Sequence, residues 1–249
     1  MIREASWMLR YAGRSLRDTV RAWPRGLAGW KKFWASYLQY TRMAPSDRQP
    51  LVGFLYPCLG DDTAETPIEP TYFYQDAWAF EKIVRNRPAR HVDVGSHYKF
   101  VALLSKVVPV TMVDLRPLSL PLDSVAFEKG SILNLPFASR SVPSVSSLCV
   151  VEHIGLGRYG DPLDSFGSEQ AIQELRRVVQ PGGDLYVSVP LDDENRVYFN
   201  AHRAFREDYV LKLFEPFQVV ERRYIYGKTF TERLQPGFGI GCYHLKCRL

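Results

Sequence analysis

Two carboxylates and a glycine turn are the first residues in this sequence that could do chemistry. Asp93-Val94-Gly95-Ser96 ends one apolar run, and Asp114 ends the next. At a strand-to-helix turn, backbone N–H groups and a helix N-terminus converge on a ligand, and a carboxylate that ends the following strand can accept both hydroxyls of a ribose. Together these residues predict a nucleoside-binding site, whereas each carboxylate taken singly could equally be an ordinary turn or strand-end residue.

The elements that must position these residues alternate between strand and helix patterns from Tyr74 onward, an order typical of a doubly wound sheet. The predicted strands are Arg90–Val94, Val110–Asp114, Ser124–Glu128, Val145–Val151 and Asp184–Val189, with Phe217–Tyr226 and Cys242–Arg248 as an antiparallel edge pair. The predicted helices are Tyr74–Asn86, Phe100–Lys106, Ser168–Val179 and Arg206–Phe214, with Pro181-Gly182-Gly183 stopping the third. The prediction is an α/β fold with a mostly parallel, seven-stranded sheet and an N-terminal helical appendage.

The length and composition fit one catalytic-type domain with an appendage. The 249 residues are 46% hydrophobic and 24% charged, and α/β sheets of this length commonly form one domain. No apolar stretch is long enough to cross a bilayer and the N-terminus lacks the apolar core of a signal peptide, so a cytoplasmic location is expected. The four cysteines show no paired spacing, which argues against a zinc site or a disulfide framework.

The positive charge is concentrated in an N-terminal arm, residues 1–43. Nine Arg or Lys residues against Glu4 and Asp18 give residues 1–42 a net charge of +7, and because the whole chain is +5 the remainder is −2. A charge confined to one arm argues against nucleic-acid binding by the main domain. An amphipathic helix is predicted over residues 5–20. A second short helix is predicted from the spacing of Leu27, Trp30, Trp34, Tyr37 and Leu38.

Two roles of this arm are open. Its helices could pack their apolar faces on the domain or on a partner chain. They could also lie in a membrane interface, which would give the protein a peripheral position on the inner membrane face. Residues 44–73, rich in Pro, Asp and Thr, are expected to form a linker or a wrapping loop, and the main domain is expected over residues 74–249.

Further motifs follow the third and fourth predicted strands. The run Gly130-Ser131-Ile132-Leu133-Asn134-Leu135-Pro136-Phe137 comes first, and the apolar fourth strand then leads into Glu152-His153. With the Asp93 turn, Asp114 and the Pro-Gly-Gly stop, this order resembles class I S-adenosylmethionine methyltransferases over residues 75–249. The runs HIGLGRYGDP (residues 153–162) and VDLRPL (residues 113–118) also resemble a methyltransferase-like family described as a domain of unknown function, with the motif EHxGLGRYGDP.

The resemblance implies a Rossmann-like methyltransferase fold with S-adenosyl-L-methionine as the cofactor. The residues that it implies for cofactor binding are Asp93, Gly95, Ser96, Asp114, Ser131 and Ile132. It also implies a small-molecule or glycan acceptor, with surface polysaccharide synthesis as a setting. His97 and Lys99 stand where glycines are usual, and Ser131 stands where an acid is usual. These departures leave open a non-catalytic protein of the same fold that binds a nucleotide-like ligand or a protein partner.

His153 is the candidate general base. Methyl transfer is an in-line displacement, so an enzyme mainly positions the nucleophile and removes its proton, which a neutral imidazole can accept. A structural histidine bonded to a loop carbonyl is the alternative. Glu152 could orient the substrate or the methionine amino group, or it could brace a loop.

The glycine-rich loop that follows contributes Arg158, Tyr159 and Asp161 as candidate substrate-binding residues. Arg158 could hold a phosphate or carboxylate of a nucleotide sugar or lipid-linked glycan in a bidentate manner. An Arg–Asp pair that only braces the loop is the alternative. His202, after the fifth strand, is a further candidate at the same rim.

Overall fold

The computed structural model describes residues 26–248, in two compact units that divide between Pro67 and Ile68. The amphipathic helix predicted over residues 5–20 lies outside the described residues. Among residues 26–248, no helix is long and apolar enough to cross a bilayer.

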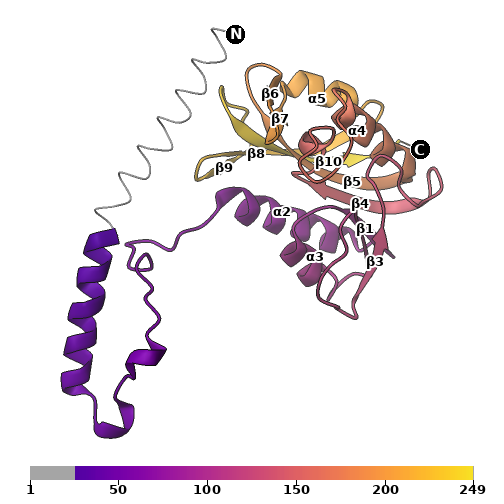
Figure 1. Cartoon of the computed structure of the whole chain (residues 1–249). Coiled ribbons are helices and arrows are strands. Elements are labelled where there is room, and N and C mark those ends of the chain that lie inside the picture. The colour runs from indigo at the N-terminus through magenta and orange to yellow at the C-terminus, as the bar shows by residue number, and fades with distance from the viewer. Residues whose placement is uncertain (1–25, 249) are drawn as a thin grey trace. The chain divides into compact units, whose positions relative to one another are not determined.

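The first unit is built around one helix, residues 26–43, drawn in indigo in Figure 1. The second short helix predicted for the arm is therefore present. Two 3-10 turns, η1 (Ser46–Arg48) and η2 (Val52–Phe54), follow it. The Gln49 side-chain amide donates to the carbonyl oxygens of Thr41 and Ala44 at 3.0 and 2.6 Å. These bonds satisfy two acceptors at the end of the helix that have no partner within the helix itself.

The second unit contains an eight-stranded sheet with the order β3-β2-β1-β4-β5-β10-β8-β9. Its strands are β1 (His91–Val94), β2 (Val110–Asp114), β3 (Val125–Lys129), β4 (Val142–Leu148), β5 (Val179–Leu191), β8 (Gln218–Tyr226), β9 (Thr229–Thr231) and β10 (Gly239–Lys246). The first five strands pair in parallel, and β10 is antiparallel to both β5 and β8. The predicted doubly wound α/β fold is confirmed. The short strand β9, which pairs with β8, is the eighth strand that the sequence pattern did not predict.

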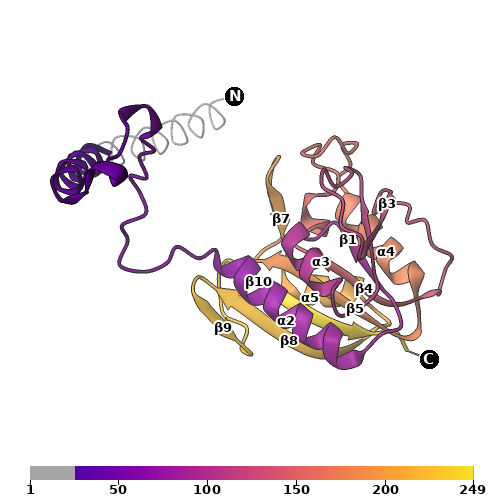
Figure 2. The same ribbon diagram turned by 90° about the horizontal axis from the view of Figure 1, so that it is seen from below.

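Helices cover both faces of this sheet, as Figures 1 and 2 show. The helices are α2 (Pro70–Asn86) and α3 (Tyr98–Leu104) on one face and α4 (Gly167–Val178) and α5 (Glu207–Leu213) on the other. Each face has its own apolar core: Trp78, Ile83 and Leu104 belong to the first, and Leu175 and Phe214 belong to the second. Strands β1 and β4 are buried, polar side chains included, because both faces of the sheet are covered.

The strand order reverses between β1 and β4, and this reversal determines where a ligand can bind. The chain moves outward from β1 through β2 to β3, then returns to place β4 on the other side of β1. At such a point the connections leave β1 and β4 in opposite directions, so a crevice forms outside the carboxyl ends of the strands. The carboxyl ends of β1, β2 and β4 therefore hold the candidate site.

Several element boundaries differ from the sequence prediction, and the largest changes in interpretation concern β4 and β5. Strand β4 ends at Leu148 and not at Val151, because Cys149 takes a left-handed backbone conformation with φ 51° and a 3-10 turn, η3 (Val151–His153), follows. Strand β5 begins at Val179, so the Pro-Gly-Gly run lies inside it and does not precede it. The pairing of β4 with β5 shifts register between Val142 and Ser144, which accommodates these residues.

Candidate functional site

A cavity of about 880 Å³ opens at the carboxyl ends of β1, β2 and β4. The predicted site residues that line it are Gly95, Ser96, Asp114, Ile132, His153, Tyr159 and Asp161. The predicted site residues that do not line it are Asp93, Ser131, Glu152, Arg158 and His202. The structure thus brings the nucleoside-binding candidates and the base candidate to one cavity, and it places the rest behind or beside the wall.

Asp93 is fully buried behind this cavity wall. Its Oδ1 accepts the Ser96 backbone N–H at 3.0 Å, and its Oδ2 accepts the Ser146 hydroxyl at 2.5 Å. Burial raises the pKa of Asp93 to about 6, although these hydrogen bonds oppose the rise. The carboxylate holds the glycine turn in place from inside the protein.

The turn itself needs glycine at position 95. Gly95 has φ +72°, a left-handed conformation that side chains rarely adopt, and a Cβ there would lie 3.1 Å from Val150 Cγ1. The Gly95 N–H donates to the Val113 carbonyl at 3.0 Å, and the Ser96 hydroxyl accepts the Leu148 N–H at 3.0 Å. The turn is therefore tied to both neighbouring strands and keeps its backbone open to the cavity.

His97 and Lys99, which replace the usual glycines, leave this cavity open. His97 has φ −64°, which any residue adopts, and its ring accepts the Lys99 N–H at 3.4 Å at the start of α3. The His97 ring stacks on Tyr98 with centroids 4.4 Å apart and lies 5.0 Å from the Tyr72 ring. Lys99 is exposed and does not line the cavity. The turn therefore accommodates a histidine at position 97 with an ordinary backbone conformation.

Asp114 ends β2 on the cavity wall. Its Oδ1 accepts the Arg116 backbone N–H at 2.8 Å, and the Arg116 guanidinium lies 3.7 Å from the same oxygen. Its Oδ2 has no hydrogen bond to any residue in the described part of the chain, so it can accept a donor from a ligand. The wall beside it is apolar and includes Met112, Val113 and Ile132. A carboxylate beside an apolar wall suits a ribose carrying a flat base.

Ser131 does not line the cavity, whereas its neighbour Ile132 does. Its hydroxyl accepts the Leu133 N–H at 3.2 Å, and it forms an isolated bridge with Asn134. Ser131 therefore stabilises a turn outside the cavity, while Gly130 and Ile132 line it.

His153 follows β4 on the 3-10 turn η3 and lines the cavity. Its Nδ1 lies 2.6 Å from the Ala201 carbonyl oxygen, which can only accept, so Nδ1 carries the proton and Nε2 has the free lone pair. Burial lowers the pKa of His153 to about 4, and the nearby charge of Arg158 adds to this effect. The ring is therefore neutral at neutral pH. The sequence offered a general base and a histidine bonded to a loop carbonyl as alternatives for His153. The geometry is compatible with both, because Nδ1 bonds the Ala201 carbonyl while Nε2 stays available.

Glu152 is buried beside His153. Its Oε1 lies 3.6 Å from His153 Nε2, which is too long for a hydrogen bond. Its Oε2 is buried and has no hydrogen-bond partner among the described residues. Burial raises the pKa of Glu152 to about 8, so the carboxyl group is mostly protonated at neutral pH. The Glu152 carboxyl group is therefore an unsatisfied polar group, buried beside a residue that lines the cavity.

Asp161 holds the glycine-rich loop together from inside. Its carboxylate accepts the N–H groups of Gly155 at 2.6 Å, Tyr159 at 3.2 Å and Gly157 at 3.4 Å. Burial alone would raise the pKa of Asp161, but these N–H donors outweigh it and lower the pKa. Gly155 has φ +83°, and a Cβ there would lie 2.1 Å from the Asp164 carbonyl oxygen. The carboxylate's hydrogen bonds are therefore within the loop.

Arg203 supports the same loop from behind, and the sequence analysis did not single it out. It is buried, with its guanidinium donating to the carbonyl oxygens of Ile154 and Asp164 and to the Ser168 hydroxyl. A buried cation bonded to carbonyl oxygens fixes the loop ends against α4. Arg203 follows the candidate residue His202 directly in the sequence, and this position was the only feature of the sequence that could have pointed to it.

Arg158 and Arg116 meet at the Tyr159 ring. The Arg158 guanidinium lies 5.0 Å from the ring centroid and donates to the Ala201 carbonyl at 3.0 Å, while Arg116 lies 4.6 Å from the same centroid. The Tyr159 ring also lies edge-on to His153 at 5.7 Å. Each guanidinium is attracted to the face of the Tyr159 ring, so the rim of the cavity next to His153 is positively charged and partly aromatic.

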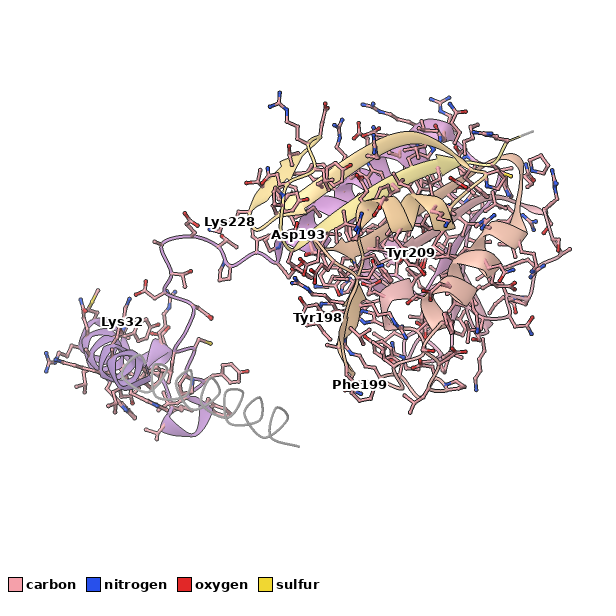
Figure 3. All side chains as sticks on the ribbon, turned by 90° about the horizontal axis from the view of Figure 1, so that it is seen from above. Lys32, Asp193, Tyr198, Phe199, Tyr209 and Lys228 are labelled. Atoms are coloured by element: carbon pink, nitrogen blue, oxygen red, sulfur yellow. The ribbon has the colours of Figure 1, made fainter. Side chains whose placement is uncertain are left out.

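His202 lies on β7 (His202–Ala204), which pairs with β6 (Arg196–Tyr198) in a separate hairpin. Tyr198 and Phe199 of this hairpin are labelled in Figure 3. The His202 ring packs against Tyr198 and Phe238, with centroids 4.9 and 5.7 Å apart. It does not line the cavity, so it is near the site but not part of its wall.

Several lining residues were missed by the sequence analysis. Tyr72, in the first turn of α2, reaches the cavity from a helix that precedes β1, and no pattern in the sequence pointed to it. Residues 115–122 line the side nearest Asp114. For these a signal existed, because a connection that leaves the carboxyl end of β2 must pass the site.

One family model matches part of the chain. The model of a family described as "Caenorhabditis protein of unknown function, DUF268" matches residues 136–233, which include η3, the glycine-rich loop and most of the second half of the sheet. No curated protein matches the sequence.

Solved structures are similar over most of the chain. N-methyltransferase NodS from Bradyrhizobium japonicum WM9, in complex with S-adenosyl-L-homocysteine, has a TM-score of 0.53 at 15% identity, with 86% of this chain and 98% of that chain covered. A putative sarcosine dimethylglycine methyltransferase from Galdieria sulphuraria has a TM-score of 0.53 at 14% identity, with 71% and 86% covered. The [4+2]-cyclase SpnF has a TM-score of 0.52 at 14% identity, with 70% and 82% covered. At these identities the likeness shows that the second unit has the class I methyltransferase fold.

Proposed function

We propose that this protein is an S-adenosyl-L-methionine-dependent methyltransferase that acts on a small molecule or a glycan. The observation that carries the proposal is one cavity with a glycine turn and a ribose-type carboxylate, Gly95 and Asp114, on one side and a neutral histidine, His153, on another. Such an arrangement supports the proposal because a nucleoside cofactor bound there would lie next to a group that can accept a proton.

The residues present fit the cofactor. Gly95 lines the cavity without a side chain, so its backbone is accessible to a ligand there. The free Oδ2 of Asp114 can accept ribose hydroxyls, and Met112 and Ile132 provide an apolar surface for an adenine ring. When bound, the cofactor supplies a methyl group on a sulfonium, which a nucleophile can displace in line.

His153 is our candidate for removing the acceptor proton. Its Nδ1 proton is held by the Ala201 carbonyl, which fixes the ring and leaves Nε2 as the accepting atom. Glu152 is the second candidate for this role, because its pKa of about 8 lies closer to neutral pH than that of His153 and its Oε2 has no partner in the described residues. The two assignments predict a different dependence of kcat/KM on pH.

The acceptor is proposed to carry a phosphate or a carboxylate. Arg158 and Arg116 bring two guanidinium groups to the rim beside Tyr159, and only Arg116 has a carboxylate, Asp114, within 4 Å in the described residues. A guanidinium pairs well with such anions, and an aromatic ring offers a flat surface to a sugar. A nucleotide sugar or a lipid-linked glycan would supply both features, with surface polysaccharide synthesis as the setting.

A calorimetric titration of the full chain with S-adenosyl-L-homocysteine tests the cofactor assignment. We expect saturable binding, and Asp114→Ala should weaken it by about 100-fold because two ribose hydroxyls lose their acceptor. Glu128→Ala is the matched control, since Glu128 is an exposed acid on the neighbouring strand β3 outside the cavity. An affinity that is unchanged in folded Asp114→Ala would overturn the assignment.

Assays with a panel of anionic glycans and small molecules then test the reaction. Methyl transfer from the labelled cofactor is the expected result. Cofactor binding without transfer to any acceptor would favour the non-catalytic alternative, and the similarity to the cyclase SpnF shows why the fold alone does not decide the reaction.

A further inference from the structure

The helix of the first unit, residues 26–43, carries an exposed apolar stripe. Leu27, Trp30, Trp34 and Leu38 follow one another at intervals of three or four residues, and they are 65%, 42%, 46% and 52% exposed. At this spacing they share one side of the helix. Phe33 makes edge contacts with both tryptophans, at 5.7 and 5.3 Å, which fix the two indole rings along the stripe.

A different side of the same helix holds the first unit together. A Cβ at Gly29 would lie 3.0 Å from the Leu59 carbonyl oxygen, so the chain following the helix packs closely there. Phe33 lies toward that side and is half-buried, as is Tyr37 at the edge of the stripe. The stripe is therefore not the side that this unit uses for its own folding.

The charges around the stripe are positive. Residues 26–46 contain Lys31, Lys32 and Arg42 and no Asp or Glu. By helical spacing, Lys31 and Arg42 border the stripe, whereas Lys32 points away from it and pairs with Asp62. Lys32 is labelled in Figure 3. The preceding sequence has the same character, since residues 1–42 carry nine Arg or Lys against two acids.

We infer that this stripe docks on an anionic lipid bilayer. Indole rings and leucines suit the boundary between headgroups and acyl chains, and lysine and arginine beside them suit anionic headgroups. Within residues 26–248 no helix can cross a bilayer, so the contact lies in the plane of the surface. The inference goes beyond methyl transfer and does not depend on it. It would tether the chain to a surface that carries membrane-resident acceptors.

Flotation of the full chain with lipid vesicles tests the inference. Vesicles of phosphatidylglycerol and phosphatidylcholine should carry the protein upward, and pure phosphatidylcholine vesicles should carry at least about tenfold less. Raising the salt concentration should weaken the binding, because a Debye length shortens from about 10 Å at 0.1 M to about 3 Å at 1 M.

Paired variants then assign the binding to the stripe. Trp30→Ala with Trp34→Ala should lower the vesicle partition by about tenfold or more, since two inserted side chains are lost. Tyr40→Ala is the matched aromatic control, because Tyr40 is 53% exposed on the same helix but outside the stripe. Lys31→Gln with Arg42→Gln should weaken binding to anionic vesicles, and Lys32→Gln should change it little.

Two results would overturn the inference. One is equal binding of the tryptophan variant and the unaltered chain, which would move the contact elsewhere. The other is absence of vesicle binding together with a lower oligomeric mass in the tryptophan variant, which would make the stripe a protein interface. Circular dichroism spectra that coincide for all variants exclude unfolding as the cause of lost binding.

Discussion

Asp93 and Asp114 lie near the carboxyl ends of neighbouring strands, yet the protein uses them differently. Asp93 pairs in register with Met112 inside the sheet and is fully buried. Asp114 lies one residue beyond the last pair between β1 and β2, and its side chain is 17% exposed on the cavity wall. Two positions along the sheet therefore separate an acid that supports the turn from an acid that can meet a ligand.

The same contrast extends to two groups of residues, which we call the inner network and the rim. The inner network is His91, Asp93, Ser144 and Ser146, all buried. The rim is Asp114, Arg116, His153, Arg158 and Tyr159. In the inner network the Ser146 hydroxyl donates to Asp93, so His91 Nε2 must donate to Ser146 at 2.8 Å and its Nδ1 must accept from Ser144 at 2.8 Å. Changes in the inner network should affect stability, and changes at the rim should affect function.

The largest effect is expected at the rim. His153→Ala should lower turnover by roughly 10²–10⁴-fold, the usual loss for a general base, and leave S-adenosyl-L-methionine affinity nearly intact. His153→Gln should do little better, because an amide holds the geometry but cannot take the proton. Steady-state kinetics and cofactor titration measure both quantities. Full activity in the Gln variant would make His153 structural.

The pH profile of the same assay decides between His153 and Glu152. A base acts when deprotonated, so activity rises as the pH passes through its pKa. With His153 as the base, kcat/KM should be flat above about pH 5, since its pKa is about 4. With Glu152 as the base, kcat/KM should rise through about pH 8 and Glu152→Gln should abolish that rise.

A smaller effect, on stability, is expected in the inner network. Asp93→Ala should lower the free energy of unfolding by about 3 kcal/mol, because the buried Ser96 N–H and the Ser146 hydroxyl lose their acceptor. Asp114→Ala, the matched change at the rim, should cost less than about 1 kcal/mol because its carboxylate is partly solvated. Urea denaturation measures both. Equal losses would contradict the division between network and rim.

The smallest effect is a change in how stability depends on pH. Burial lowers the pKa of His91 from 6.5 to about 3, so its contribution is present above pH 6.5 and is lost as the pH falls toward 3. Burial raises the pKa of Asp93 from 3.8 to about 6, so its contribution is present below pH 3.8 and is lost as the pH rises through 6. Between pH 4 and 6 the two contributions oppose each other.

Replacing His91 separates these contributions. In His91→Asn only the Asp93 contribution remains, so the stability of the unaltered protein relative to the variant should increase by about 2–3 kcal/mol between about pH 4 and pH 6. Urea denaturation at several pH values measures this difference. His97→Asn is the control, because His97 is only half-buried and should change the slope less. If the free energy of unfolding depends on pH in the same way for the unaltered protein and for His91→Asn, burial does not lower the pKa of His91 as assigned.

The sequence predicted the sheet well because its signals are local. The valines of β1 and β2 and the helical spacing of Ile172, Leu175 and Val178 each lie within one element. The end of β4 was misplaced because the left-handed backbone at Cys149 is imposed by tertiary contacts, and cysteine carries no turn signal. The strand β9 is three residues long, too short for alternation to show.

The site was less accessible to prediction, because it depends on which way each side chain points. The residues of the glycine turn and Asp114 were identified from their place at strand ends. Whether a side chain lines the cavity or lies behind it depends on the pleat and on neighbouring strands, which is why Asp93 and Ser131 could not be separated from Gly95 and Ile132. Tyr72 could not be found at all, since its helix packs there only in the folded protein.

The Asp161 carboxylate accepts three backbone N–H groups of its own loop. These hydrogen bonds hold the loop backbone in place without the side chains that point outward. Residues such as Arg158 and Leu163 can then be exchanged without dismantling the turn that presents them. A lineage could change what the cavity accepts by altering a few outward side chains. Within such a lineage, we expect the loop glycines and Asp161 to stay the same, and we expect the outward residues to vary with the substrate.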